Sequence, residues 1–159
     1  MTRNYKSEVV KVKLSTKGRY GLKAMFELAL NEASETPMPL KYIAEKHGLS
    51  EQYLEQIFAI LKKSNLVKSV RGAQGGYLLS KSSSLITVGS VLRALEGPMA
   101  PADCVIESDS DCENSEFCVT QVVWRKIKDS IDSVIDSVTL EDMVNDHNLK
   151  GGQIDIEEM

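Results

Sequence analysis

The chain has 159 residues, of which 42% are hydrophobic and 26% charged, and its formal net charge is −4. This length suits one domain with an appendage, and no apolar run is long enough to span a membrane. The first 13 residues lack the apolar core of a secretory signal, so we expect a cytoplasmic chain with reduced thiols.

The net charge conceals an asymmetry between the two halves of the chain. Residues 1–81 contain 14 Lys and Arg against 7 Asp and Glu, whereas residues 82–159 contain 5 against 16. A basic half joined to an acidic half is typical of a module that binds duplex DNA and carries a separate control region. The negative total therefore does not exclude nucleic acid as a partner.

In chain order, residues 1–12 are polar and basic, which predicts a disordered N-terminal extension. A helix is then expected from Ser15 or Thr16 to about Ala33, because apolar residues recur on one face of it. Pro37 and Pro39 end the connection and favour the start of the next helix.

The stretch from Leu40 to Leu79 predicts a winged helix-turn-helix. Gly48 ends a helix over residues 40–47, and Ser50 can cap a second helix from Glu51 to Lys63. Two strand-like runs follow, Val67 to Val70 and Gly76 to Leu79, with a glycine-rich tip between them. The alternative is a helical hairpin and a β-hairpin inside another fold. Agreement of the signals over forty residues favours a mainly α, winged helix-turn-helix protein.

The predicted second helix and the wing supply candidate DNA contacts. On the outward face of the helix, Gln52 and Gln56 can pair with adenine and Glu55 can accept from cytosine in the major groove. Arg71, at the base of the wing, can enter a narrow A·T-rich minor groove. Further candidates for phosphate contacts are Lys17, Arg19, Lys62, Lys63 and Lys68.

Three cysteines follow the wing, after a short helix from Val88 to Leu95 that Thr87 can cap. Cys104, Cys112 and Cys118 lie in a loop over residues 98–118, with seven and then five residues between them. An odd number of clustered thiols is poor disulfide material, and the spacing is wrong for a C-x2-C zinc knuckle. From spacing alone, an iron–sulfur cluster, a zinc site and incidental cysteines stay open.

A long amphipathic helix is predicted after the third cysteine. Its apolar residues recur every three or four positions: Val123, Ile127, Ile131, Val134 and Val138. No later helix of similar length is predicted to cover this stripe, so we expect two copies to pack together as a symmetric dimer. A dimer also suits a protein that binds a palindromic site in double-stranded DNA. A short capped helix over residues 139–144 should follow.

Three stretches resemble the IscR-type winged-helix regulators, a family that includes the nitric-oxide sensor NsrR and the cluster-free regulator CymR. They are residues 13–21 (KLSTKGRYG), 53–56 (YLEQ) and 70–77 (VRGAQGGY). The resemblance extends from Lys13 to about Val144. It implies a homodimer that controls transcription through an iron–sulfur cluster, 2Fe-2S or 4Fe-4S, on Cys104, Cys112 and Cys118.

The chain departs from the family pattern at one position. IscR places a histidine three residues after the third cysteine, and here that residue is Gln121. An amide is a poorer iron ligand than an imidazole, so the resemblance leaves the fourth ligand open. Relatives with a ligand in the first helix have an acidic residue where this chain has Arg19.

These patterns divide the chain into five parts. They are an extension over 1–12, a DNA-binding domain over 13–97, the cysteine loop over 98–118, a dimerisation helix and a short helix over 119–144, and a mobile acidic tail over 145–159. We expect a cluster-sensing transcription regulator. The alternative is a CymR-like regulator controlled by a partner protein, with incidental or zinc-binding cysteines. No nucleophile–base pair or phosphate loop predicts an enzyme.

Overall fold

The computed structural model describes residues 14–106 and 118–157, and the side chains among them as far as Gly151. The predicted extension over 1–12, Cys112 and the last two residues lie outside the described residues. No helix in the described part is long and apolar enough to cross a membrane.

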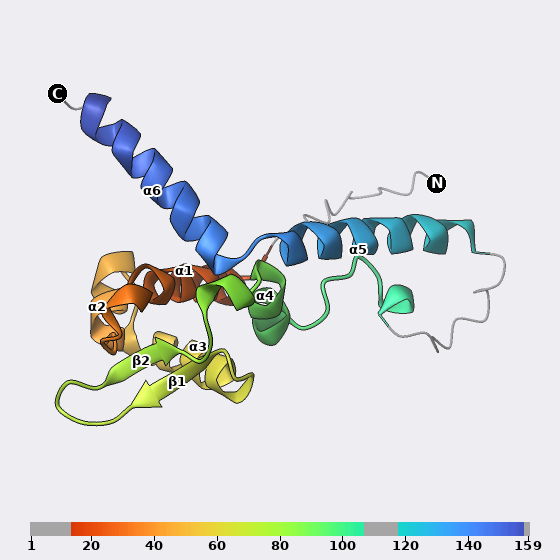
Figure 1. The fold of residues 1–159 in the computed structure, drawn as a ribbon. Coiled ribbons are helices and arrows are strands. Elements are labelled where there is room, and N and C mark those ends of the chain that lie inside the picture. Colours follow the sequence, from red (N-terminus) through yellow and green to blue (C-terminus); the bar gives the residue numbers. More distant parts are fainter. Residues whose placement is uncertain (1–13, 107–117, 158–159) are drawn as a thin grey trace, which may run out of the picture.

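The N-terminal part is the predicted winged helix-turn-helix, formed by α1 (Thr16–Leu30), α2 (Leu40–His47), α3 (Glu51–Lys63) and the hairpin of β1 (Val67–Val70) and β2 (Gly76–Leu79). Figure 1 shows the hairpin projecting beside α3. The predicted fold class is confirmed. The first helix is shorter than expected, because Asn31 ends α1 and a separate 3-10 turn, η1 (Glu32–Ser34), follows.

The core lies where α1, α2, α3 and α4 (Val88–Glu96) meet the hairpin. The apolar residues of α3 recur at the spacing of one helix face and are fully buried: Leu54, Ile57, Phe58 and Leu61 are each 0% exposed. Gly48, with φ of 64°, ends α2 in the left-handed region that glycine favours. The Ser50 hydroxyl accepts from Tyr53 N at 3.1 Å and so caps α3. Local signals therefore set the elbow between the two helices.

An isolated antiparallel bridge between Met38 and Tyr77 attaches the wing to the segment just before α2. Met38 N donates to Tyr77 O at 3.0 Å, and Tyr77 N donates to Met38 O at 2.9 Å. Gly76 is required at this crossing, because a Cβ there would lie 2.4 Å from the backbone of Met38. The Tyr77 ring also packs on Phe58 of α3, with 4.7 Å between ring centroids. The wing thus has a fixed position relative to both helices of the motif.

Two long helices form the C-terminal part of the described chain, α5 (Val119–Ser137) and α6 (Leu140–Glu157). α5 extends away from the DNA-binding part, and α6 points in another direction (Figure 1). The Thr139 hydroxyl and Asp142 carboxylate cap the start of α6 reciprocally, as predicted. The predicted end near Val144 is wrong, since the helix continues to Glu157 and the His147 ring lies 5.5 Å from that of Phe26.

Candidate nucleic-acid interface and cysteine site

The outward face of α3 carries the residues predicted to contact bases. Gln52, Glu55 and Gln56 are all exposed, on the side opposite the buried stripe. None of the three takes part in a hydrogen bond or ion pair within the described part of the chain. Their polar groups therefore remain available to a partner. An exposed helix with polar side chains beside a wing has the shape and chemistry to enter a major groove.

The wing carries Arg71 in its tip loop, and not at its base as predicted. Arg71 is exposed and follows directly after β1. The turn closes with Gly75 N donating to Gly72 O at 3.0 Å, and Gly72 has φ of 120°. A Cβ on Gly75 would lie 2.4 Å from Val70 O, so the tight tip depends on glycine. The tip thus presents a guanidinium on a narrow backbone, as minor-groove insertion needs.

The predicted phosphate-contact residues occupy different places around this surface. Lys62, Lys63 and Lys68 are exposed near the base of the wing, whereas Lys17 and Arg19 lie in the first turns of α1, where Lys17 is half-buried. Lys62 Nζ also donates to Ser69 Oγ at 2.7 Å and so links the end of α3 to β1. One of the five therefore has a structural contact in addition to its predicted role.

A buried carboxylate that the sequence analysis did not predict joins α1 to the C-terminal turn of α2. Glu27 of α1 is 4% exposed, and its two oxygens lie 2.8 Å from Lys46 Nζ and 3.0 Å from His47 Nε2. The hydrogen bond to Glu27 raises the pKa of Lys46. Both partners lie in the last turn of α2, where cations are favoured by the helix dipole. The only signal in the sequence is an acid among the apolar residues of α1.

The cysteine site lies around the N-terminus of α5, far from the wing (Figure 1). Cys118 immediately precedes α5, and its Sγ lies 3.1 Å from Thr120 Oγ1. The Thr120 hydroxyl and then the backbone N–H of Gln121 lower the pKa of the Cys118 thiol. A helix N-terminus favours negative charge, so this position promotes the thiolate that binds metals.

Gln121 connects Cys104 to the same helix end. Cys104 lies in a 3-10 turn, η3 (Asp103–Val105), which the sequence did not predict. The Gln121 Nε2 donates to the Cys104 backbone O at 3.3 Å. The side chain that replaces the family's histidine therefore holds the turn that carries the first cysteine, and two of the three predicted ligands come to one region.

The donor set is incomplete within the described residues. No group of three or more His, Cys, Asp or Glu side chains with metal-binding geometry occurs among them. Cys112, the remaining predicted ligand, is outside this part of the chain. Cys104 and Cys118 are both half-buried free thiols, and soft thiolates of this kind are the usual ligands of iron–sulfur clusters.

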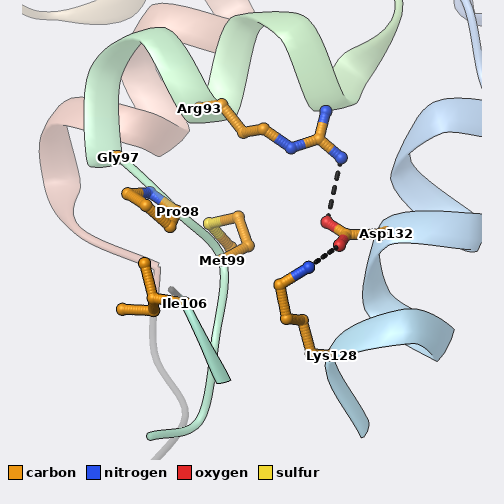
Figure 2. A pocket seen from close by; sticks show the side chains of 7 residues that line it. All are labelled: Arg93, Gly97, Pro98, Met99, Ile106, Lys128 and Asp132. Carbon is orange, nitrogen blue, oxygen red and sulfur yellow. Dashed lines mark hydrogen bonds and ion pairs between the residues drawn. The ribbon is translucent and has the colours of Figure 1, made fainter. Parts of the chain in front are cut away.

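An ion network joins α4 to α5 (Figure 2). The Arg93 guanidinium lies 2.9 Å from the Asp132 carboxylate and 2.7 Å from that of Asp136, and Lys128 Nζ lies 2.7 Å from Asp132. Hydrogen bonds to Asp136 and Asp132 raise the pKa of Arg93 far above its usual range. Hydrogen bonds from Lys128 and Arg93 lower the pKa of Asp132.

A cavity of about 320 Å³ lies beside this network. Figure 2 shows Arg93, Lys128 and Asp132 on one side of it and the stem of the cysteine loop, Gly97 to Met99, on the other. Ile106 also lines the cavity. Free space therefore adjoins the stem of the loop.

α5 presents two different faces. Trp124, Ile131 and Ile135 are half-buried on the face that packs within the chain. A second apolar face is exposed, and it comprises Val119, Val122, Val123, Ile127 and Val134. Of the predicted dimer residues, Val123, Ile127 and Val134 thus face away from the described chain, while Ile131 and Val138 are half-buried.

Comparison with known proteins identifies the family. Residues 14–146 match the Rrf2 family model, described as an iron-dependent transcriptional regulator. The chain is 44% identical over 134 residues to the transcriptional regulator CymR of Bacillus subtilis, covering 84% of this chain and 91% of that protein. It is 39% identical over 138 residues to the regulator IscR of Erwinia tasmaniensis, covering 87% and 82%.

Solved structures give the same result. The structure of IscR from T. potens superposes with a TM-score of 0.70 at 49% identity, covering 86% of this chain and 89% of that one. The structure of CymR, the global cysteine regulator of B. subtilis, superposes with a TM-score of 0.69 at 44% identity, covering 84% and 97%. The predicted resemblance is confirmed, and the chain belongs to the Rrf2 family of DNA-binding transcriptional regulators, which are not enzymes.

Proposed function

We propose that this regulator is a homodimer whose promoter binding is controlled by an iron–sulfur cluster on Cys104, Cys112 and Cys118. The main support is the hydrogen bond from Gln121 to Cys104 O, because it brings the first cysteine to the helix end where Cys118 lies. These two thiols and the N-terminus of α5 make a site that fits thiolate ligands.

The roles of the individual residues follow from their contacts. Cys104, Cys112 and Cys118 would bind the cluster, and Gln121 would position the turn that carries Cys104. When bound, a cluster of the 2Fe-2S or 4Fe-4S type supplies a centre that reacts with oxygen or nitric oxide. Because an amide oxygen is a poorer iron ligand than a thiolate or an imidazole, we propose that Gln121 is not the fourth ligand.

The competing function is that of a CymR-like regulator controlled by a partner protein, with incidental or zinc-binding cysteines. The B. subtilis relative named CymR is 44% identical over 84% of this chain, and the cited IscR protein is 39% identical over 87%. Anaerobically purified protein distinguishes the two. Visible charge-transfer bands with stoichiometric iron and sulfide support the cluster, whereas a colourless protein without iron contradicts it.

For the DNA interface, we propose that α3 contacts bases through Gln52, Glu55 and Gln56 while the wing contacts the minor groove through Arg71. Lys17, Arg19, Lys62, Lys63 and Lys68 would bind phosphates. The exposed apolar face of α5 would pair with a second copy, so that two copies of α3 could bind a palindromic site.

Glu55→Ala is expected to reduce the discrimination between DNA sequences more than it lowers the affinity for the preferred site. Its carboxylate is exposed on α3 and disfavours phosphates, so its main effect would be to penalise bases that offer it no donor. The measurement is competition between the selected site and its single-base variants. Glu45→Ala, with the same charge change on α2, is the control. A parallel loss of affinity for all sites would show that Glu55 does not discriminate.

Arg71→Ala is expected to weaken binding to an A·T-flanked site by about 1–3 kcal/mol. The exposed guanidinium on the glycine tip would be lost, while the wing pairing and the dimer face stay intact. A titration at fixed salt measures the effect, and Gln74→Ala on the same tip is the control. Unchanged affinity would remove Arg71 from the interface.

A further inference from the structure

Glu96, the last residue of α4, caps the start of α1. Its Oε1 accepts from Ser15 N and from Gly18 N, each at 3.1 Å, and also from the Ser15 hydroxyl. The first N–H groups of a helix have no partner within the helix, so a carboxylate at this place satisfies them and is favoured by the helix dipole. The contact joins residues 78 to 81 positions apart in the sequence.

Gly18 makes this close approach possible. Gly18 is buried, and a Cβ built on it would lie 2.2 Å from Glu96 Oε1. The carboxylate therefore rests directly on the first turn of α1. Gly18 is in an ordinary helical conformation, so alanine suits the backbone there and would displace mainly the Glu96 side chain.

The position of Glu96 links the two functional regions. Gly97, with φ of 81°, follows it and begins the stem of the loop that leads to Cys104. On the other side of the contact, the first turns of α1 carry Lys17 and Arg19, the proposed phosphate contacts. A single side chain thus connects the base of the cysteine loop to the DNA-binding surface.

Ion pairs hold the middle of α4 against α5, and a cavity lies beside the stem. Arg93, one turn before Glu96, is fixed to α5 by Asp132 and Asp136. The 320 Å³ cavity adjoins Gly97 and its neighbours in the stem (Figure 2). A rearrangement of the loop therefore has room to shift the stem, and Glu96, the residue directly before the stem, contacts α1.

We propose that Glu96 is a positioning residue for DNA binding that transmits the state of the cysteine loop to α1. With the loop in one state the carboxylate holds the first turn of α1, and in the other it releases that turn, which changes how Lys17 and Arg19 meet phosphates. The inference rests on the proposed cluster function, because the cluster defines the two states.

The test compares DNA affinity with and without the cluster for wild type, Glu96→Ala, Glu96→Gln and Gly18→Ala. The probe is a palindromic duplex selected from random sequence by the wild-type protein. Glu96→Ala and Gly18→Ala should bring the ratio of the two affinities about tenfold closer to one, within the usual range of allosteric coupling. Glu96→Gln keeps an oxygen that can accept the same bonds and should retain most of the ratio.

Glu32→Ala is the matched control. Glu32 also accepts from a serine N–H and hydroxyl, those of Ser83, but it makes no hydrogen bond to the described residues of the cysteine loop. Its loss should affect both affinities equally and leave their ratio unchanged. A ratio that stays at the wild-type value in Glu96→Ala, or that falls as far in Glu32→Ala, overturns the role of Glu96.

A second measurement separates this inference from the cluster itself. In cluster-free protein, Glu96→Ala and Lys17→Ala should be non-additive in DNA affinity, because Glu96 acts through the turn that carries Lys17. Wild-type protein that incorporates no iron would contradict the proposed function, and the double-mutant cycle would then decide on Glu96 alone. Additive effects in that cycle overturn the link to α1.

Discussion

Cys118→Ala, like Cys104→Ala and Cys112→Ala, is expected to abolish iron and sulfide incorporation. Three thiolates are the strong soft ligands of the proposed site, and Cys118 is also the one favoured by the N-terminus of α5. Iron, sulfide and visible absorbance of anaerobically reconstituted protein measure the loss. Thr120→Val, which removes the hydroxyl beside Cys118 and leaves all three thiols, should retain the cluster.

Gln121 variants test whether the amide is a ligand. Gln121→Ala should still incorporate iron and sulfide, but its absorbance should decay faster in air, because the turn around Cys104 loses its hydrogen bond. Gln121→His restores the residue of the family pattern and should slow that decay. If Gln121→Ala lacks iron as fully as Cys118→Ala does, the amide is a ligand and the positioning role is wrong.

Ile127→Asp is expected to convert the proposed dimer into monomers. Ile127 lies in the middle of the exposed apolar face of α5, and Val123 and Val134 beside it are 49% and 64% exposed. Burying an unpaired charge between two copies costs about 3–5 kcal/mol, which raises the dissociation constant by at least about a hundredfold. Sedimentation equilibrium measures the change.

The choice of residue matters for this experiment. Ile131 is central in the predicted stripe, but it is half-buried against its own chain, so Ile131→Asp would also disturb the packing of α5. Leu85→Asp is the control, because Leu85 is also an exposed apolar residue, 68% exposed, but lies outside α5 in the 3-10 turn Ser83–Leu85. A dimer that survives Ile127→Asp would show that copies associate through another surface.

The motif itself could be predicted from sequence because its signals are local. Gly48 marks the end of α2, Ser50 marks the start of α3, and the glycines at 72, 75 and 76 mark the wing tip. The buried stripe of α3 follows from its period. These elements need no knowledge of distant residues, and each has the predicted bounds.

The contacts that join the parts could not be predicted in this way. Glu27 with Lys46, Arg93 with Asp136, and Glu96 with Gly18 pair residues that lie 19, 43 and 78 positions apart. Nothing in a local pattern distinguishes such charged residues from solvated ones. The length of α6 was missed for a related reason, since residues 145–150 are all exposed and leave no apolar period to follow.

The strand pairing of Met38 with Tyr77 has a consequence for the thermodynamics of recognition. Pro39, the residue after Met38, is the N-cap of α2, so the wing cannot swing without moving the helix-turn-helix. A preorganised surface loses little conformational entropy when it meets its target. Free protein should therefore already hold the wing in its bound orientation. Calorimetry should accordingly show only a small loss of conformational entropy of the protein when the duplex binds.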